Sequence, residues 1–178
     1  MSIGELASFV CSHLAGHGIN VVLTGGACVT IYSGNRYQSL DIDFIDNGAT
    51  PRRQLKQVLK MIGFAEYQRY FRHPDTRYFL EFPAGPLAVG NAPAGCIAAL
   101  KFPSGTLRLL SPTDCVKDRL AAYYHWKDRQ SLEQALLVAR RRSIDLKEIQ
   151  RWSGQEGMAA EYSKIARLLV KKRSINIG

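Results

Sequence analysis

One run of the chain, LTGGACVTIYSGNRYQSLDIDFID at residues 23–46, constrains the fold more than any other because its periodicity changes twice. A β-branched run stops at the pair Gly25-Gly26, and the residues after the pair keep apolar side chains at helical spacing. The segment SLDIDFID then alternates polar and apolar positions, as a strand with one wet face does. The run therefore predicts strand, tight turn, helix and strand, in that order.

Two further helices are expected around this run. Apolar positions at helical spacing predict a helix at 3–16. Thr50 as N-cap and Pro51 as first helical residue open another, which is expected to end at Gly63.

Short strands are expected after that helix. The aromatic-rich segments FAEYQRYFRH and TRYFLEFP flank a turn signal at residues 73–75 and predict a hairpin. Residues 85–105 are rich in Gly, Pro and Ala and are expected to hold one or two short strands or a loop, with TLRLL as a last strand.

The character of the chain changes at Ser111, where SPTD offers an N-cap serine, a proline at the first helical position and an acid at the third. Helices are expected to dominate from there, at residues 112–125, 129–141, 145–152 and 157–172. The pattern predicts an α+β fold in which a small mixed sheet flanked by helices is followed by a C-terminal helical bundle. We expect an α+β domain at 1–110 and a helical region packed on it at 111–178.

Composition narrows the class of protein. With 46% hydrophobic and 22% charged residues, the chain has the composition of a globular domain and not of a disordered one. No basic segment precedes the first apolar residues, and no apolar run approaches the roughly 18 residues of a membrane span, so a cytoplasmic protein without membrane contact is expected.

The net charge of +9 points to the kind of partner. Residues 1–110 hold ten basic and seven acidic residues, whereas 111–178 hold fourteen and eight, so the shorter half is the more basic. Such a field attracts nucleic acid or nucleoside triphosphates and repels cationic small molecules. The basic clusters at 140–142 and 168–173 (LLVKKR) are read either as contacts of this kind or as ordinary helix ends.

The expected strand SLDIDFID carries a candidate metal site. Leu40, Ile42 and Phe44 are expected to face one way, and Asp41 and Asp43 the other. The Cα atoms of the two aspartates then lie roughly 7 Å apart with both carboxylates on one face, so that they can hold Mg²⁺. The alternative is an exposed strand face with two solvated acids.

The pair Gly25-Gly26 is a candidate phosphate site. It lies between a strand and a helix, where unobstructed backbone N–H groups at a helix N-terminus attract anions. The alternative is a tight turn that requires glycine for its positive φ alone.

Three more residues complete the candidate site. Glu81 alternates out of phase with the apolar residues of YFLEF, so it is expected on the same polar face as the aspartates and can serve as a third carboxylate. Arg36 and Ser39 stand just before the acids, where they can contact phosphate oxygens or steady a carboxylate. A solvated glutamate and a solvated loop arginine are the alternatives.

Together these residues resemble the nucleotidyltransferases of the DNA polymerase β superfamily, whose signature is a glycine pair opening a helix, followed by D-x-D on the next strand. The form GGA…Y…R…S.DIDF, with Gly-Gly in place of Gly-Ser, is especially similar to the AbiEii-like branch, found as toxins of toxin–antitoxin systems. LLSPTDCVKDRLAAYYHWKDRQSLEQA resembles the helical region of those relatives.

The resemblance implies an Mg²⁺-dependent transfer of a nucleoside monophosphate from a nucleoside triphosphate to an acceptor hydroxyl. Thr24, Gly25 and Gly26, with Arg36 and Ser39, would bind the nucleotide. Asp41, Asp43 and Glu81 would ligate the metal, and Glu81 would assist deprotonation of the hydroxyl.

Toxin relatives also use a lysine and a later aspartate in the helical region. Lys127 and Asp128 are the first candidates for these roles, and the pair Lys117-Asp118 is the second. A salt-bridged helix surface is the alternative for both.

RNA, such as a tRNA end, is the expected acceptor, because a chain of net charge +9 would repel a polycationic antibiotic. A protein acceptor and an antitoxin partner are further expectations of the resemblance. The alternative function is a catalytically silent nucleotide- or nucleic-acid-binding module that keeps the fold.

Overall fold

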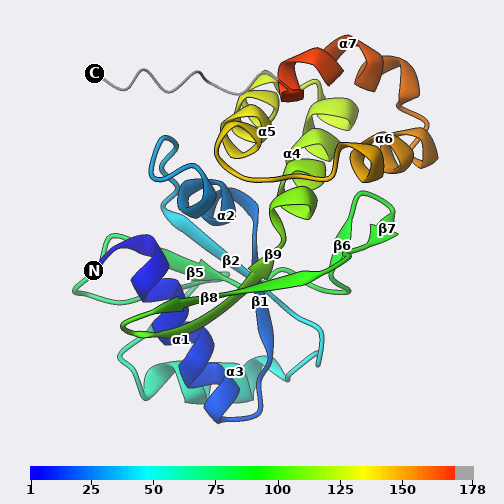
Figure 1. Ribbon diagram of the computed structural model, residues 1–178. Coiled ribbons are helices and arrows are strands. Elements are labelled where there is room, and N and C mark those ends of the chain that lie inside the picture. The colour runs from blue at the N-terminus through cyan, green and yellow to red at the C-terminus, as the bar shows by residue number, and fades with distance from the viewer. Residues whose placement is uncertain (171–178) are drawn as a thin grey trace, which may run out of the picture.

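The computed structural model describes residues 1–170 as an α+β fold, in which a mixed sheet lies below a group of helices (Figure 1). This is the fold class that the sequence predicts. The helices are α1 (Ile3–Gly16), α2 (Gly25–Tyr32), α3 (Arg52–Lys60), α4 (Pro112–Trp126), α5 (Arg129–Arg141), α6 (Leu146–Gln155) and α7 (Ala159–Val170). The strands are β1 (Val21–Thr24), β2 (Asp41–Asp46), β3 (Ala65–Tyr67), β4 (Tyr70–Arg72), β5 (Phe79–Glu81), β6 (Ala88–Val89), β7 (Ala92–Pro93), β8 (Ile97–Phe102) and β9 (Gly105–Leu110).

The main sheet has seven strands in the order β3-β4-β5-β2-β1-β9-β8, and β6 and β7 form a separate hairpin. Strand β2 is antiparallel to β1 and parallel to β5. The D-I-D strand therefore lies inside the sheet, between the strand that leads into the glycine pair and the strand that carries Glu81.

The two faces of β2 differ as the alternation predicts. Ile42 and Phe44 are fully buried, whereas Asp41 and Asp43 are half-buried on the opposite face. The expectation that Leu40 shares the buried face was wrong: its side chain is 47% exposed. Leu40 precedes the strand, so no pleat fixes its direction.

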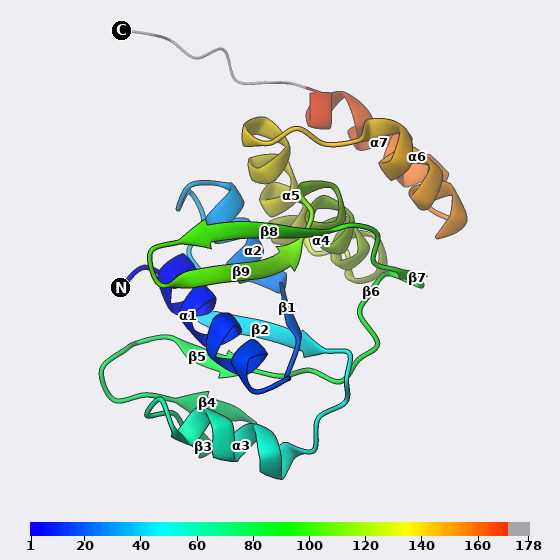
Figure 2. The ribbon, with the colours of Figure 1, turned by 60° about the horizontal axis from the view of Figure 1, so that its bottom comes forward.

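Helices cover the two faces of the sheet unequally. Helices α1 and α3 lie on the face to which Ile42 and Phe44 point, and His13 of α1 bonds to the Val58 carbonyl of α3 (3.0 Å). Helix α2 packs on the other face against β1 and β2 and is itself covered by α4 and α5. Figure 2 shows the outer strands β3 and β4 with α3 alongside them. On the face that carries the aspartates, α2 and α4 thus cover the part of the sheet near β1 and β9.

Three local expectations need correction. Pro51, not Thr50, is the N-cap of α3, because the Pro51 carbonyl accepts the first helical bond from the Leu55 amide (3.1 Å) and the helix starts only at Arg52. The two aromatic-rich segments do pair as an antiparallel hairpin, β4 with β5, but FAEYQRYFRH also folds back on itself as β3–β4, with Gln68 at φ +55° in the two-residue turn. Residues 85–105 hold β6, β7 and the six-residue β8, more strand than expected.

The four helices after Ser111 lie close to the predicted positions. Ser111 caps α4 by accepting a hydrogen bond from the Asp114 amide (3.1 Å), as SPTD predicts. The last helix is observed to Val170, and the end of the expected helix 157–172 and the residues Lys171–Arg173 lie outside the described part. No helix within residues 1–170 is long and apolar enough to cross a membrane.

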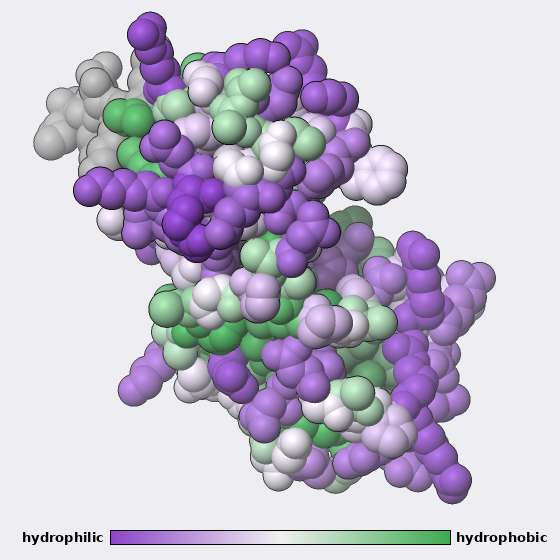
Figure 3. Space-filling model, turned by 90° about the vertical axis from the view of Figure 1, so that its right-hand side faces the viewer, coloured by the Kyte–Doolittle hydropathy of each residue, from purple (hydrophilic) through white to green (hydrophobic). Residues whose placement is uncertain are grey.

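The molecule is narrower where the C-terminal helices α4–α7 (the helical half) join the part that contains the main sheet (the sheet half). Figure 3 shows this narrowing, with hydrophilic residues over most of the helical half above it. Trp152 and Tyr124 are the largest fully buried side chains of the helical half, and the indole of Trp152 donates to the Val89 carbonyl of the β6–β7 hairpin (3.1 Å). The β6–β7 hairpin, which lies between β5 and β8 in the chain, is therefore bonded to α6 of the helical half.

Candidate active site

The glycine pair forms the first turn of α2, with no loop between strand and helix. Gly25 has φ +65°, a left-handed conformation that favours glycine. Thr24 is the N-cap, yet its side chain makes no capping bond to the helix and instead donates to the Asp43 carbonyl (3.4 Å). The first N–H groups of α2 are therefore left without a side-chain acceptor, which is the arrangement that attracts an anion.

Asp43 lies directly against this turn. Thr24 and Asp43 are paired across β1 and β2, and a β-carbon placed on Gly25 would be 2.5 Å from Oδ2 of Asp43. Glycine at position 25 is thus required twice, by the backbone conformation and by the space that the carboxylate fills.

Three carboxylates share the face of the sheet beside the turn. Asp43 is in register with Glu81 across the parallel pair β2–β5, and Asp41 stands two residues before Asp43. Burial raises the pKa of the Asp43 carboxyl to about 6, with the Glu81 and Asp41 carboxylates adding to the rise and Arg119 opposing it. The negative charge gathered here favours a cation.

Asp41 and Asp43 offer the hard oxygen donors that Mg²⁺ prefers. A cation beside Asp43 would counter both causes of its raised pKa, burial first and then the neighbouring Glu81 and Asp41 carboxylates. Glu81 faces a different partner, since Nε of Arg69 lies 3.4 Å from its Oε1. Within residues 1–170, no three His, Cys, Asp or Glu side chains converge closely enough to hold one ion as they stand. The two aspartates would hold the magnesium ion, and Glu81, whose Oε1 pairs with Arg69, would be a third ligand.

A cleft of about 280 Å³ opens beside Asp43. This volume is near the lower end of the ~300–1,000 Å³ usual for ligand pockets. Its walls come from three parts of the chain: the turn and β2, the segment after β5, and α4. The lining residues are Thr24, Gly25, Asp43, Ile45, Pro83, Ala84, Pro86, Ala88, Asp118 and Arg119.

Arg119 is a residue of the cleft that the sequence reasoning missed. Its guanidinium pairs with the Asp118 carboxylate (Nη2 to Oδ2 2.5 Å, Nε to Oδ2 3.0 Å) and donates to Gln134 of α5 (3.4 Å). The side chain is 20% exposed, so the cation is held in place while part of it stays open to the cleft. No sequence signal marked it, because the phase of α4 relative to the cleft depends on packing.

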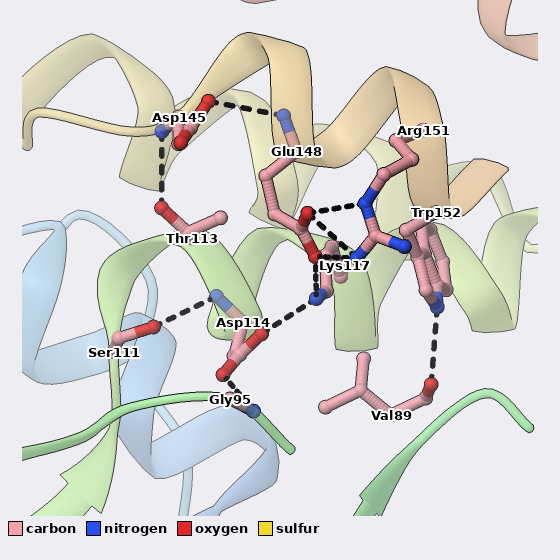
Figure 4. Close-up of polar contacts among 10 residues, drawn as sticks. All are labelled: Val89, Gly95, Ser111, Thr113, Asp114, Lys117, Asp145, Glu148, Arg151 and Trp152. Carbon is pink, nitrogen blue, oxygen red and sulfur yellow. Dashed lines mark hydrogen bonds and ion pairs between the residues drawn. The ribbon is translucent and has the colours of Figure 1, made fainter. Parts of the chain in front are cut away.

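Lys117 does not line the cleft, and Figure 4 shows its ammonium between Asp114 of α4 and Glu148 of α6. Its ammonium pairs with Asp114 (2.8 Å) and Glu148 (3.1 Å), and its side chain is 4% exposed. Asp114 in turn accepts from the Gly95 amide (2.8 Å). Of the second candidate pair, the structure therefore brings Asp118 to the cleft and gives Lys117 a packing role.

Lys127 and Asp128, the first candidates in the helical region, form the turn between α4 and α5. Lys127 is exposed and ends α4 with φ +54°. Asp128 is the N-cap of α5, accepting from the Gln130 amide (3.0 Å) and the Ser131 hydroxyl (2.6 Å). Neither residue lines the cleft.

Ser39 and Arg36 lie in the segment that leads from α2 to β2. The Ser39 hydroxyl donates to the Asp41 carbonyl (3.1 Å) and accepts from the Asp41 amide (3.2 Å), while a β-carbon on Gly26 would be 3.0 Å from it. Ser39 therefore fixes the start of β2 against the first turn of α2. Arg36 is exposed and forms no ion pair with another residue of the described part.

The chain resembles solved structures over nearly its whole length. An antigenic nucleotidyltransferase-like protein from Paracoccidioides brasiliensis has a TM-score of 0.63 at 15% identity, over 96% of this chain and 93% of its own. The antibiotic-resistance factor ANT(2'')-Ia in solution has a TM-score of 0.57 at 15% identity, over 93% and 94% of the two chains. Its crystal structure in complex with adenylyl-2''-tobramycin gives 0.54 at 15% identity, over 92% and 98%.

No protein-family model matches the sequence, and no curated protein matches it either. At 15% identity the structural likeness establishes the fold alone. That fold is the one shared by these nucleotidyltransferase-like structures, and the similarity to the AbiEii-like branch stays a prediction.

Proposed function

We propose that the protein is a nucleotidyltransferase that transfers a nucleoside monophosphate from a nucleoside triphosphate to an acceptor hydroxyl. One observation carries the proposal: the Asp43 carboxylate lies against Gly25 at the uncapped N-terminus of α2, with Glu81 in register beside it. An anion site and a cation site are thereby adjacent, as a metal–triphosphate complex requires.

Each residue has a role in this proposal. The backbone N–H groups at Thr24, Gly25 and Gly26 bind the triphosphate, and Asp41 and Asp43 hold Mg²⁺. The ion would supply positive charge to the phosphate oxygens when bound.

The acceptor hydroxyl attacks the α-phosphorus, so that a new P–O bond forms while the bond to pyrophosphate breaks. Glu81, whose Oε1 pairs with Arg69, takes up the proton of the hydroxyl as general base. Arg119, open to the same cleft, neutralises phosphate charge.

We propose RNA, such as a tRNA end, as the acceptor. ANT(2'')-Ia shares the fold and is described with adenylyl-2''-tobramycin, so an antibiotic acceptor is the natural competitor. The charge of this chain supports RNA, since a protein of net charge +9 attracts a polyanion and repels a polycation. A protein acceptor would be identified by label appearing on polypeptide instead of RNA.

The direct test incubates the protein with each labelled nucleoside triphosphate, Mg²⁺ and total RNA. Label is expected on RNA, and Asp41→Ala and Asp43→Ala should abolish it. Asp75→Asn is the matched control, because that carboxylate is 88% exposed and outside the cleft. Transfer that persists in both alanine variants would exclude the proposal.

A silent binding module is the second candidate function. The observation that favours it is the pairing of Glu81 with Arg69, which occupies the proposed third carboxylate. Calorimetry separates the two candidates, since a silent module binds the triphosphate without dependence on Mg²⁺ and without turnover.

The resemblance to the AbiEii-like branch leads us to propose a toxin role with an antitoxin partner. Induction of the wild type in a host without the antitoxin should arrest growth, whereas Asp43→Asn should not. Growth unaffected by strong expression of active enzyme would count against this role.

A further inference from the structure

The face of the sheet that carries the carboxylates continues beyond them over β5, β4 and β3. One row of paired positions runs Asp43, Glu81, Tyr70, Tyr67, and the next runs Asp41, Phe79, Arg72. Paired residues on adjacent strands point to the same face, with strands about 4.8 Å apart. Aromatic rings therefore begin on β5, the strand of Glu81, and continue with Tyr70, Arg72 and Tyr67 on the next two strands.

This part of the face is open. The alternate residues Phe71 and Leu80 are fully buried on the opposite side, where Arg52 of α3 lies over the Phe71 ring (4.4 Å). Tyr67 is 53% exposed. The sheet thus buries one face against α3, while on the other Tyr67, Arg69 and Arg72 are exposed and the Tyr70 and Phe79 rings are half-buried.

The rings and guanidinium groups are stacked on one another. The Arg72 guanidinium lies 4.6 Å from the centre of the Tyr67 ring and 5.9 Å from that of Phe79. Arg69 lies over Tyr70 (4.7 Å), and the Tyr70 and Phe79 rings meet edge to face at 4.9 Å. We name Tyr67, Arg69, Tyr70, Arg72 and Phe79 the aromatic–arginine face.

These features match the chemistry of single-stranded nucleic acid. Unpaired bases stack on aromatic rings and on guanidinium planes, while arginine charge meets the phosphates. Bases in a duplex are already stacked on one another and offer no free face. The tyrosine hydroxyls and guanidinium groups can also bond a ribose 2′-OH, which DNA lacks.

We infer that the aromatic–arginine face binds a single-stranded RNA segment whose terminal hydroxyl reaches the carboxylates of the adjoining site. The inference rests on the proposed function for its acceptor, and adds where and in what form the RNA binds. Arg69 belongs to both places, since it stacks on Tyr70 and pairs with Glu81. RNA phosphates that draw Arg69 away would release Glu81.

The test measures RNA binding without nucleotide or Mg²⁺, by fluorescence anisotropy of a labelled single strand of about ten nucleotides. Tyr67→Ala and Arg72→Ala are each expected to weaken binding about 5- to 100-fold, whereas Tyr67→Trp keeps it. Arg53→Ala is the charge-matched control, because Arg53 is exposed on α3, which packs on the opposite face. Unchanged affinity in both alanine variants would overturn the inference, and so would equal binding of a duplex or of single-stranded DNA.

The outcome is separable from that of the proposed function. Asp41→Asn/Asp43→Asn should bind the RNA at least as tightly as the wild type, because the variant loses negative charge while the aromatic–arginine face is intact. RNA binding without any transfer activity would refute the proposed function and leave the binding face, whereas transfer to RNA that ignores Tyr67 and Arg72 would do the reverse.

Discussion

Oδ2 of Asp43 occupies the space that a β-carbon on residue 25 would need, 2.5 Å away. Gly25→Ala should therefore destabilise the protein by about 1–2 kcal/mol through its left-handed backbone and displace the carboxylate, lowering transfer by ~100-fold. Gly18→Ala is the matched control, because Gly18 also has a positive φ (+75°) but nothing lies within 4 Å of its β-carbon position. Both variants should unfold at a lower temperature than the wild type. Only Gly25→Ala should also lose transfer activity.

Asp43→Asn should stabilise the protein in metal-free buffer near neutral pH. Because the folded-state pKa of about 6 exceeds the ordinary 3.8, the folded protein binds the extra proton, and the contribution of Asp43 to stability falls as pH rises from about 4 to 6. Removing the charge should raise the free energy of unfolding by on the order of 2 kcal/mol at about pH 7, and should not change it below about pH 4. Denaturant unfolding at both pH values checks this, and Mg²⁺ should stabilise the wild type more than the variant. A gain that is the same at both pH values would contradict the proposed cause.

Arg119→Gln should weaken binding of the triphosphate about tenfold or more, because it removes the cation that faces the cleft beside Asp43. Isothermal titration with a non-hydrolysable triphosphate measures the change. Arg140→Gln is the control, since Arg140 is exposed near the end of α5 and outside the cleft. Equal affinity of the two variants would exclude a phosphate role for Arg119.

Lys117→Met should destabilise the fold by about 3–5 kcal/mol, because it leaves the buried Asp114 carboxylate without its cation. Adding Asp114→Asn removes that unpaired charge and should recover much of the loss. Chemical unfolding of the two single variants and the double variant measures the coupling. If Lys117 instead acted in catalysis, a stable Lys117→Met variant would be inactive.

Asp128 can be tested for a catalytic role apart from its cap. Asn caps a helix about as well as Asp, whereas Ala at the N-cap lowers the stability of the protein by about 1 kcal/mol. If Asp128 only caps α5, Asp128→Asn should be as stable and as active as the wild type. Asp128→Ala should then be less stable than the wild type but equally active while folded. A stable Asp128→Asn variant without activity would assign the carboxylate to the reaction.

Local rules predicted the elements that carry the site. The alternation of SLDIDFID places Asp41 and Asp43 opposite Ile42 and Phe44, and the glycine pair marks the change from strand to helix. These features are visible in sequence because each depends on neighbours within a few residues.

The remaining features depend on packing between distant segments. The register of Glu81 with Asp43 is a parallel pairing across α3 and the β3–β4 hairpin, and no local pattern sets it. The sequence does not indicate the β3–β4 turn, because Gln68 adopts a positive φ without the Gly or Asn that usually marks a tight turn. The exposure of Arg119 to the cleft follows from how α4 rotates onto the sheet.

The contribution of α4 to the wall of the cleft bears on how the protein matures during synthesis. Asp118 and Arg119 lie beyond the last strand, so the cleft is incomplete in any nascent chain that ends before them. A truncated product ending near residue 110 would contain every strand and all three carboxylates, yet lack this wall. Competence to bind nucleotide should therefore arise only after α4 has emerged from the ribosome and docked, and residues 1–110 alone should not yield a working enzyme.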